Sequence, residues 1–349
     1  MIRMRRRDVL GLPLLAAVPA GDSLTLGAYG SPKSFWDRGH RLDEYGINAV
    51  FVHSGAIDDA LIRRARAEGA RVFAEFAAWN GRNAPPEALP IDQSGRPSPQ
   101  QTWFMGICPT HQPFLQSRLA ELEKLVTTRE IDGVFLDYLH WHAQFEDPHP
   151  GLPETCFNRS CVERFSKEAG PRVAGDDPAV WAADILRHHD AAWRDWRCSM
   201  VVDFARRCRA ILTRHAPRML LGNYHCAWRD DEHSAARRRI LGLDATALDG
   251  AFDVLSPMVY HGRSGRPVEW VRQNVEWLAQ QVGGAKVWPI VQAWSDPNGH
   301  KVSAAEFEQV LRGGLSGGTS GVMMFTLGAV VEDPEKMGVL KKVYRGLAA

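Results

Sequence analysis

The stretch that decides the fold is Gly133-Val134-Phe135-Leu136-Asp137, a short apolar run that ends in a carboxylate. Runs of this kind recur along the chain, each bounded by Gly, Asp or Pro and separated from the next by an amphipathic stretch. Apolar strands that alternate with helices indicate a parallel sheet covered on both faces. The predicted strands are residues 24–29, 47–53, 72–77, 133–137, 219–224, 254–260, 287–293 and 321–326.

Eight such units favour closure into a (β/α)8 barrel (a TIM barrel, fold class α/β). An open doubly wound sheet is the alternative, but no GxGxxG motif follows the first strand. We expect a single barrel domain over residues 21–349, with long loops after the third and fourth strands at 80–112 and 143–154. Both loops leave the carboxyl ends of strands, where barrels build their active sites.

The composition excludes several classes of partner. Hydrophobic residues make up 45% of the 349 residues and charged residues 24%, which predicts a globular chain with a large core. A formal net charge of +1 gives no field to attract nucleic acid or an anionic membrane, so neither is expected as a partner. The chain has 12 tryptophans, whose broad apolar faces are suited to stacking on sugar rings.

The N-terminus has the order of a signal peptide. Arg5, Arg6 and Arg7 precede the apolar run Val9–Val18, and small residues follow up to Ala20. We predict a twin-arginine signal over residues 1–20 and export to the periplasm or the medium. The alternative is a cytosolic chain with a basic start. The apolar run is too short to span a membrane, and no other stretch of the sequence is as apolar. We therefore expect no stable membrane span in the mature chain.

The 6 cysteines include a close pair, Cys156 and Cys161, in a loop-like stretch. Because an exported chain meets oxidising conditions, we expect at least one of these two in a disulfide, with the other or with Cys108. A zinc site is the competing idea, but the spacing is not that of a CxxC pair and no second pair accompanies it. The sequence therefore predicts no metal and no other cofactor.

Two carboxylates lie on expected inward faces of strands. Side chains alternate along a strand, so Asp137 shares a face with Phe135, and Glu75 shares one with Phe73. Two carboxyl groups that face one cleft are the minimum equipment for hydrolysis of a glycosidic bond. We expect Asp137 to be the ionised carboxylate, with Glu75 as the first candidate for the general acid and Asp230 as the second.

Polar and aromatic residues gather near the carboxyl ends of several other strands. Each could be an ordinary strand end that meets water, but together they predict a substrate-binding rim. The candidate substrate-binding residues are His53, Trp79, Tyr138, His140, Asn223, His225, Tyr260, Gln292 and Trp294.

Several segments resemble a known group of proteins. The segments are Asp132–Tyr138, Cys108-Pro109, Cys156–Phe165 and Ser256–Tyr260. They resemble hypothetical glycoside hydrolases of the family 10-like and related barrel groups, over about residues 72–326. The resemblance implies a carbohydrate-active barrel in which Asp137 matches the fourth-strand acid.

Family 18 glycosidases give a contrast. Their fourth strand is similar at Asp132 and Asp137, and their sixth strand at Met258 and Tyr260. The position of their acid glutamate holds Leu139 here. This departure argues against family 18 chemistry, because the proton donor is missing.

The sequence therefore predicts a hydrolase that cleaves an O-glycosidic bond of an oligo- or polysaccharide by a two-carboxylate mechanism. It does not specify the sugar, the linkage, the stereochemical outcome or the oligomeric state. One rival is a carbohydrate-binding barrel without catalysis, suggested by Leu139. The other is a metal-assisted hydrolase that uses His53, His140, His142 and Asp137.

Overall fold

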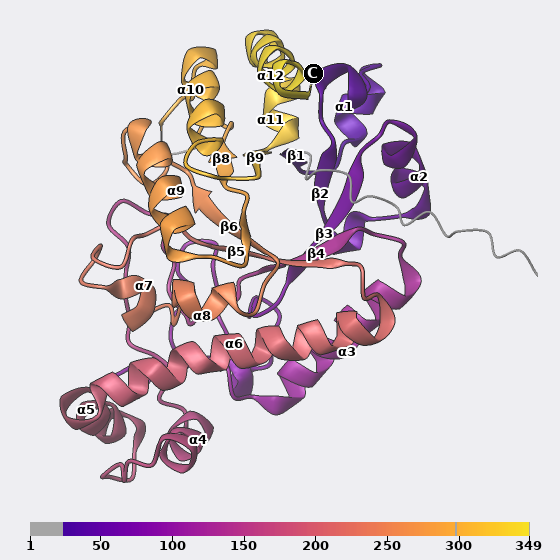
Figure 1. The fold of residues 1–349 in the computed structure, drawn as a ribbon. Coiled ribbons are helices and arrows are strands. Elements are labelled where there is room, and N and C mark those ends of the chain that lie inside the picture. The colour runs from indigo at the N-terminus through magenta and orange to yellow at the C-terminus, as the bar shows by residue number, and fades with distance from the viewer. Residues whose placement is uncertain (1–23, 297–298, 349) are drawn as a thin grey trace, which may run out of the picture.

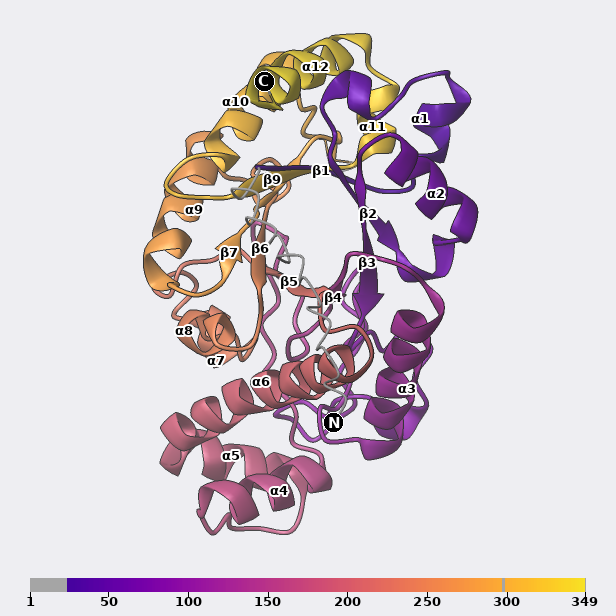
Figure 2. The same cartoon turned by 45° about the vertical axis from the view of Figure 1, so that its right-hand side comes forward.

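The computed structural model describes residues 24–296 and 299–348, and within them the predicted barrel is confirmed (Figures 1 and 2). The strands are β1 (Thr25–Tyr29), β2 (Ala49–His53), β3 (Arg71–Ala77), β4 (Gly133–Asp137), β5 (Leu220–Cys226), β6 (Val254–Val259), β7 (Lys286–Val287), β8 (Ile290–Gln292) and β9 (Gly321–Phe325). They pair in the order β5-β4-β3-β2-β1-β9-β8-β6-β7, and a further pairing of β5 with β6 closes the ring. The pairings between these strands are parallel.

Helices surround the ring of strands, as Figure 2 shows. They are α1 (Lys33–Asp37), α2 (Asp59–Ala67), α3 (Gln112–Thr128), α4 (Arg159–Ala169), α5 (Pro178–His188), α6 (Asp190–His215), α7 (Ala236–Arg239), α8 (Ala245–Asp249), α9 (Glu269–Gln281), α10 (Ala304–Gly314), α11 (Leu327–Val331) and α12 (Pro334–Ala348). The long helix α6 packs against α3, and α4 and α5 pack on its other end, outside the ring (Figure 1).

The predicted seventh strand, residues 287–293, appears as two short strands, β7 and β8. Pro289 stands at the break, and a proline has no N–H to donate to a neighbouring strand. The other seven predicted strands agree with the structure to within two residues at each end.

The interior of the barrel is a separate aromatic core. The rings of Phe51 and Phe73 stack at 4.8 Å, and Phe135 stands edge-on to Phe51 at 5.0 Å. Gly222 leaves the room that Phe135 needs, because a Cβ at this position would lie 2.4 Å from the Phe135 ring. Since Phe73 and Phe135 point inward, residues two positions later on the same strands also point inward.

All six cysteines are free and buried in the structure. The expected disulfide at Cys156 or Cys161 is therefore absent. The Sγ atoms of Cys108 and Cys161 lie 3.5 Å apart, well beyond the roughly 2.05 Å of a disulfide bond.

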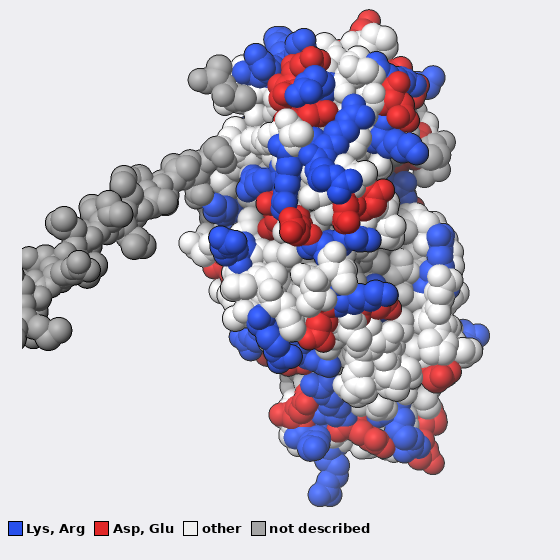
Figure 3. Space-filling view, turned by 90° about the vertical axis from the view of Figure 1, so that its right-hand side faces the viewer, with Lys and Arg blue, Asp and Glu red and all other residues white. Residues whose placement is uncertain are grey.

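The helices and the surface charge concern the two partners that the sequence analysis did not expect, a membrane and nucleic acid. Among the described residues, no helix has the length and apolarity needed to cross a membrane. On the face drawn in Figure 3, acidic and basic side chains are interspersed over the surface. The predicted signal over residues 1–20 lies outside the described residues.

Candidate active site

Asp137 ends β4 at the carboxyl-terminal rim of the barrel, and its side chain points inward. The next residue, Tyr138, has a φ of 59°, a left-handed conformation that is costly for a non-glycine residue and is typical of functional sites. The Tyr138 N–H donates to Oδ1 of Asp137 over 2.8 Å. This turn holds one oxygen of the carboxyl group, and among the described residues the other oxygen has no hydrogen-bond partner.

A cavity of about 320 Å³ opens at this rim. Its lining residues are Tyr29, Trp103, Phe104, Asp137, Tyr138, His140, Ala143, Gln144, Phe145, Glu146, Met258, Tyr260, Arg263, Trp294 and Phe325. Five of the residues proposed from the sequence are among them, namely Asp137, Tyr138, His140, Tyr260 and Trp294. The cavity is therefore built from the ends of several strands and from the two long loops.

Aromatic rings form most of the cavity wall. The rings of Tyr260 and Trp294 meet edge-to-face at 4.8 Å, and Tyr29 packs on Phe325 at 4.6 Å. Trp103, from the loop after β3, remains 38% exposed at the wall. Such a wall presents apolar faces to a ligand while leaving the polar groups to fix its orientation.

Glu146 is the second carboxylate of the cavity, and sequence reasoning missed it. It lies in the loop after β4 and is only 9% exposed. Its Oε2 forms an ion pair with Nε of Arg263 at 2.8 Å. Burial raises the pKa of Glu146 to about 7, and the charge and hydrogen bond of Arg263 oppose that rise.

Gln292, which the sequence analysis named as a substrate-binding residue, instead positions Arg263. Oε1 of Gln292 accepts a hydrogen bond from the backbone N–H of Arg263 over 3.0 Å. Nη1 of Arg263 also lies 3.5 Å from Oδ2 of Asp296. Gln292 is buried and does not line the cavity, so its place is beneath the loop that carries Arg263.

Glu75 lies deeper in the barrel than Asp137 and does not line the cavity. The Tyr29 hydroxyl donates a hydrogen bond to its Oε2. Burial raises the pKa of Glu75, opposed by this bond and by His53. Burial also raises the pKa of Asp137, and the neighbouring charge of Glu75 raises it further. The two carboxyl groups therefore interact, and each disfavours ionisation of the other.

Three predicted substrate ligands face away from the cavity. Tyr224 points into the barrel, so its neighbours on β5, Asn223 and His225, point outward toward the helices. Asn223 donates to the Leu136 carbonyl over 3.1 Å, and the structure buries His225 almost completely. Trp79 is 1% exposed and packs in the outer core. We therefore remove Asn223, His225 and Trp79 from the candidate ligands.

Two further candidates lie elsewhere on the rim. His53 is exposed and lines a second, more polar cavity between β2, β3 and the start of α3. Asp230 is a surface residue with 63% of its side chain exposed, and it pairs with Arg237 at 3.2 Å. Asp230 does not line the cavity of Asp137, so it is not placed to act as the general acid there.

The histidines of the metal-assisted alternative do not converge. Nδ1 of His142 accepts from the Gly106 N–H over 3.0 Å, and its Nε2 lies 3.1 Å from the Pro99 carbonyl. Nδ1 of His140 lies 2.8 Å from the Trp141 carbonyl. Among the described residues, neither group of three neighbouring metal-ligating side chains includes Asp137 or these histidines. The geometry thus gives no support to a metal site at Asp137.

The fold is a (β/α)8 barrel, and solved structures of glycoside hydrolases share it. No protein-family model matches the chain, and a search of curated proteins finds no match either. Similarity is found among solved structures, at identities that establish the fold alone.

One similar structure is the glycoside hydrolase domain of PgaB (BpsB) from Bordetella bronchiseptica. It has a TM-score of 0.71 at 14% identity, over 92% of this chain and 99% of that one. A β-galactosidase from Bacillus circulans sp. alkalophilus has a TM-score of 0.69 at 13% identity, over 93% of this chain and 56% of that one. α-L-Fucosidase isoenzyme 2 from Paenibacillus thiaminolyticus has a TM-score of 0.59 at 13% identity, over 93% and 49% respectively. These similarities do not point to family 10 or family 18.

Proposed function

We propose that the protein hydrolyses an O-glycosidic bond of an oligo- or polysaccharide, with Asp137 as the proton donor and Glu146 as the ionised carboxylate. One observation carries the proposal: two carboxyl groups, one at the end of β4 and one in the loop that follows, line the same aromatic cavity. Glycoside hydrolases need such a pair, one protonated and one ionised. The barrel neighbours that are glycoside hydrolases support the same class of reaction.

The surroundings of the two groups decide which one holds the proton. Burial and the charges of Glu75 and Glu146 raise the pKa of Asp137, and only the Tyr138 N–H opposes them. Glu146 has a cation, Arg263, in contact with it. Arg263 therefore favours the ionised form of Glu146, whereas burial and the neighbouring acids favour the protonated form of Asp137. This assignment reverses the ionised role that the sequence analysis gave to Asp137.

In the proposed reaction, Asp137 gives its proton to the leaving glycosidic oxygen. Glu146 then either attacks the anomeric carbon or activates a water molecule on the opposite face of the sugar. Which of the two occurs depends on the distance between the two carboxyl groups when substrate is bound. This distance is about 5–5.5 Å in retaining enzymes and about 6.5–9.5 Å in inverting enzymes. The aromatic wall would stack on the sugar rings and exclude water from the charges that develop.

The proposal is tested by screening purified protein against aryl glycosides and polysaccharides, with Asp137→Asn and Glu146→Gln as controls. Turnover that Glu146→Gln lacks on every substrate, and that Asp137→Asn lacks on polysaccharides, would support the assignment. Turnover that survives in both variants at the wild-type rate would contradict it. Saccharide binding by calorimetry, with no turnover on any substrate, would instead identify a binding barrel.

Trp103 gives a test of sugar stacking. We expect Trp103→Ala to raise KM about three- to tenfold with little change in kcat, since an exposed ring at the cavity wall contributes binding rather than chemistry. Trp277→Ala, on α9 and away from the cavity, is the matched control and should leave KM unchanged. An unchanged KM for Trp103→Ala would remove this residue from the binding site.

We also propose export by the twin-arginine route, which rests on Arg6 and Arg7 ahead of the apolar run. Replacing both arginines with lysine should keep the precursor in the cytoplasm. Cell fractionation and N-terminal sequencing measure this, and the mature wild-type chain should begin near Gly21. A double variant that still appears outside, cut at the same position, would show that another route is used.

A further inference from the structure

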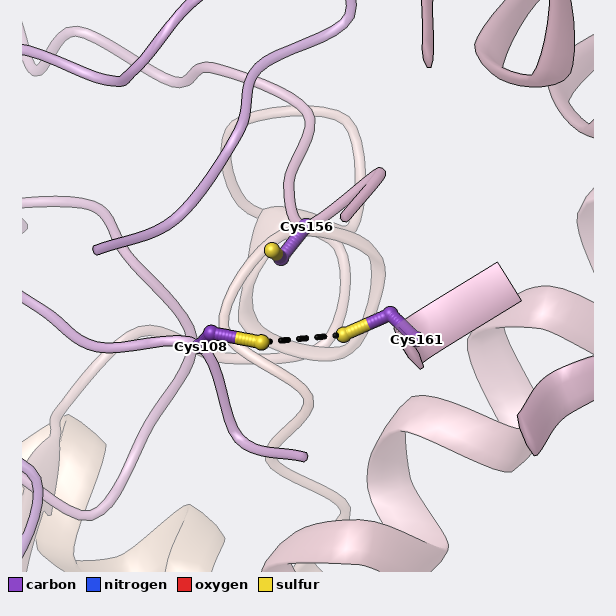
Figure 4. A group of neighbouring side chains, drawn as sticks. All are labelled: Cys108, Cys156 and Cys161. Atoms are coloured by element: carbon purple, nitrogen blue, oxygen red, sulfur yellow. Dashed lines mark hydrogen bonds between the residues drawn. The ribbon is translucent and has the colours of Figure 1, made fainter. Parts of the chain in front are cut away.

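Three cysteines from different segments meet in one buried cluster beside the active-site loops (Figure 4). Cys108 lies at the end of the loop after β3, Cys156 in the loop after β4, and Cys161 in the first turn of α4. Each is 0% exposed, and their Sγ atoms all lie within 4.8 Å of one another. In Figure 4 the sulfur atoms of Cys108 and Cys161 point toward each other, and the sulfur atom of Cys156 lies above them in the view.

The spacing of these sulfur atoms fits a shared metal ion better than a disulfide. Thiolates at about 2.3 Å from a tetrahedral zinc ion lie about 3.8 Å apart. The Cys108 and Cys161 sulfurs are 3.5 Å apart, and all three sulfurs are within 4.8 Å, so small side-chain movements would bring them to this distance. The Thr110 hydroxyl lies 3.3 Å from the sulfur of Cys108 and 3.2 Å from that of Cys161.

The charge around the cluster also suits an anionic metal complex. One zinc ion with three thiolates carries a net charge of −1. Nη1 of the fully buried Arg197 lies 3.3 Å from Glu154, and Arg239 pairs with the same carboxylate at 2.6 Å. Two arginines thus share one acid, which leaves one positive charge uncompensated within this group. Arg197 is also close enough to Cys156 and Cys161 to interact with them electrostatically.

We propose that Cys108, Cys156 and Cys161 bind one zinc ion, or a similar thiophilic divalent cation, with water or the Thr110 hydroxyl in the fourth position. The site would join the loop that carries Trp103 to the loop that carries Glu146. It replaces both expectations drawn from the sequence for these cysteines, a disulfide and no metal. The site is separate from the cavity of Asp137 and does not depend on the proposed hydrolase activity.

The test is the zinc content of the full chain, expressed with added zinc and purified under reducing conditions. We expect one zinc per chain by mass spectrometry of the metal, and loss of zinc in Cys108→Ser, Cys156→Ser and Cys161→Ser. Mutation of a residue that hydrogen-bonds to a metal ligand typically lowers metal affinity about 10- to 100-fold. Removal of a ligand itself should therefore lower the affinity for zinc by more than that. Cys208→Ser, which removes a buried thiol on α6, is the matched control and should keep its zinc.

A second measurement covers variants that fail to fold. Cobalt(II) added to reduced, zinc-free wild type should give a thiolate-to-cobalt absorption band at one equivalent, and the melting temperature should rise with metal. No band in the folded wild type would overturn the proposal. So would a zinc content in the three cysteine variants equal to that of wild type, or a Cys108–Cys161 disulfide without zinc in protein purified without reductant.

Discussion

Replacing Asp137 with asparagine is expected to lower kcat by about a thousandfold on glycosides with poor leaving groups, because the proton donor is lost. Asparagine has nearly the same size and can still accept the hydrogen bond from the Tyr138 N–H. On aryl glycosides whose leaving group departs without a proton, the variant should lose far less. Steady-state kinetics on a series of leaving groups measures this difference, which a nucleophile variant would not show.

The stability of the same variant separates catalysis from structure. The pKa of Asp137 is raised in the folded protein, so its contribution to stability is complete below the pKa of the unfolded chain and is lost as pH rises through the folded pKa. The asparagine side chain of the variant cannot ionise, so its melting temperature should match or exceed that of wild type at neutral and alkaline pH. A variant that is less stable yet fully active would show that Asp137 has a structural role only.

Replacing Glu146 with glutamine is expected to abolish turnover on all substrates, including those with good leaving groups, because the ionised carboxylate acts on every one of them. In wild type, kcat/KM should rise with pH through about 7, the pKa of Glu146, as this group loses its proton. A second limb of the profile should follow the loss of the proton of Asp137, whose pKa burial and the neighbouring acids raise.

Arg263 provides the control for this assignment. Its ion pair with Glu146 opposes the effect of burial on the pKa of that carboxyl group, so Arg263→Gln should move the acidic limb of the pH profile upward and leave the alkaline limb in place. If the acidic limb of the pH profile does not move in Arg263→Gln, a group other than Glu146 determines the pH at which it occurs. A Glu146→Gln enzyme with wild-type turnover would leave Asp137 to be paired with a different carboxylate.

The barrel could be predicted from the sequence because its signal is repeated. Each strand is a short apolar run, and alternation along β3 and β4 correctly placed Glu75 and Asp137 inward. On β5 the sequence analysis chose the face of Asn223 and His225, whereas Tyr224 points into the barrel. The structure selects the face on which Gly222 makes room for the Phe135 ring, and this choice turns Asn223 outward. A packing relation between two strands is not visible in either strand alone.

The loops could not be predicted in the same way. Glu146 lies among Gln144, Phe145 and Asp147 in a stretch without periodicity, and nothing local distinguishes it from a solvated acid. Its role depends on contact with Arg263, more than a hundred residues later. The three cysteines likewise come together only through the paths of two long loops, and their spacing in the chain matches no metal-binding pattern.

The proposed catalytic pair is divided between two kinds of structure. Asp137 is part of the barrel wall, where neighbouring strands fix its backbone, whereas Glu146 is carried by an inserted loop. Insertions in loops are tolerated far more easily than changes in a closed sheet. A descendant of this protein could therefore exchange the loop, lose the second carboxylate and still fold, keeping an aromatic cavity with a single acid. Hydrolase and lectin-like forms would then differ by one segment of a shared scaffold.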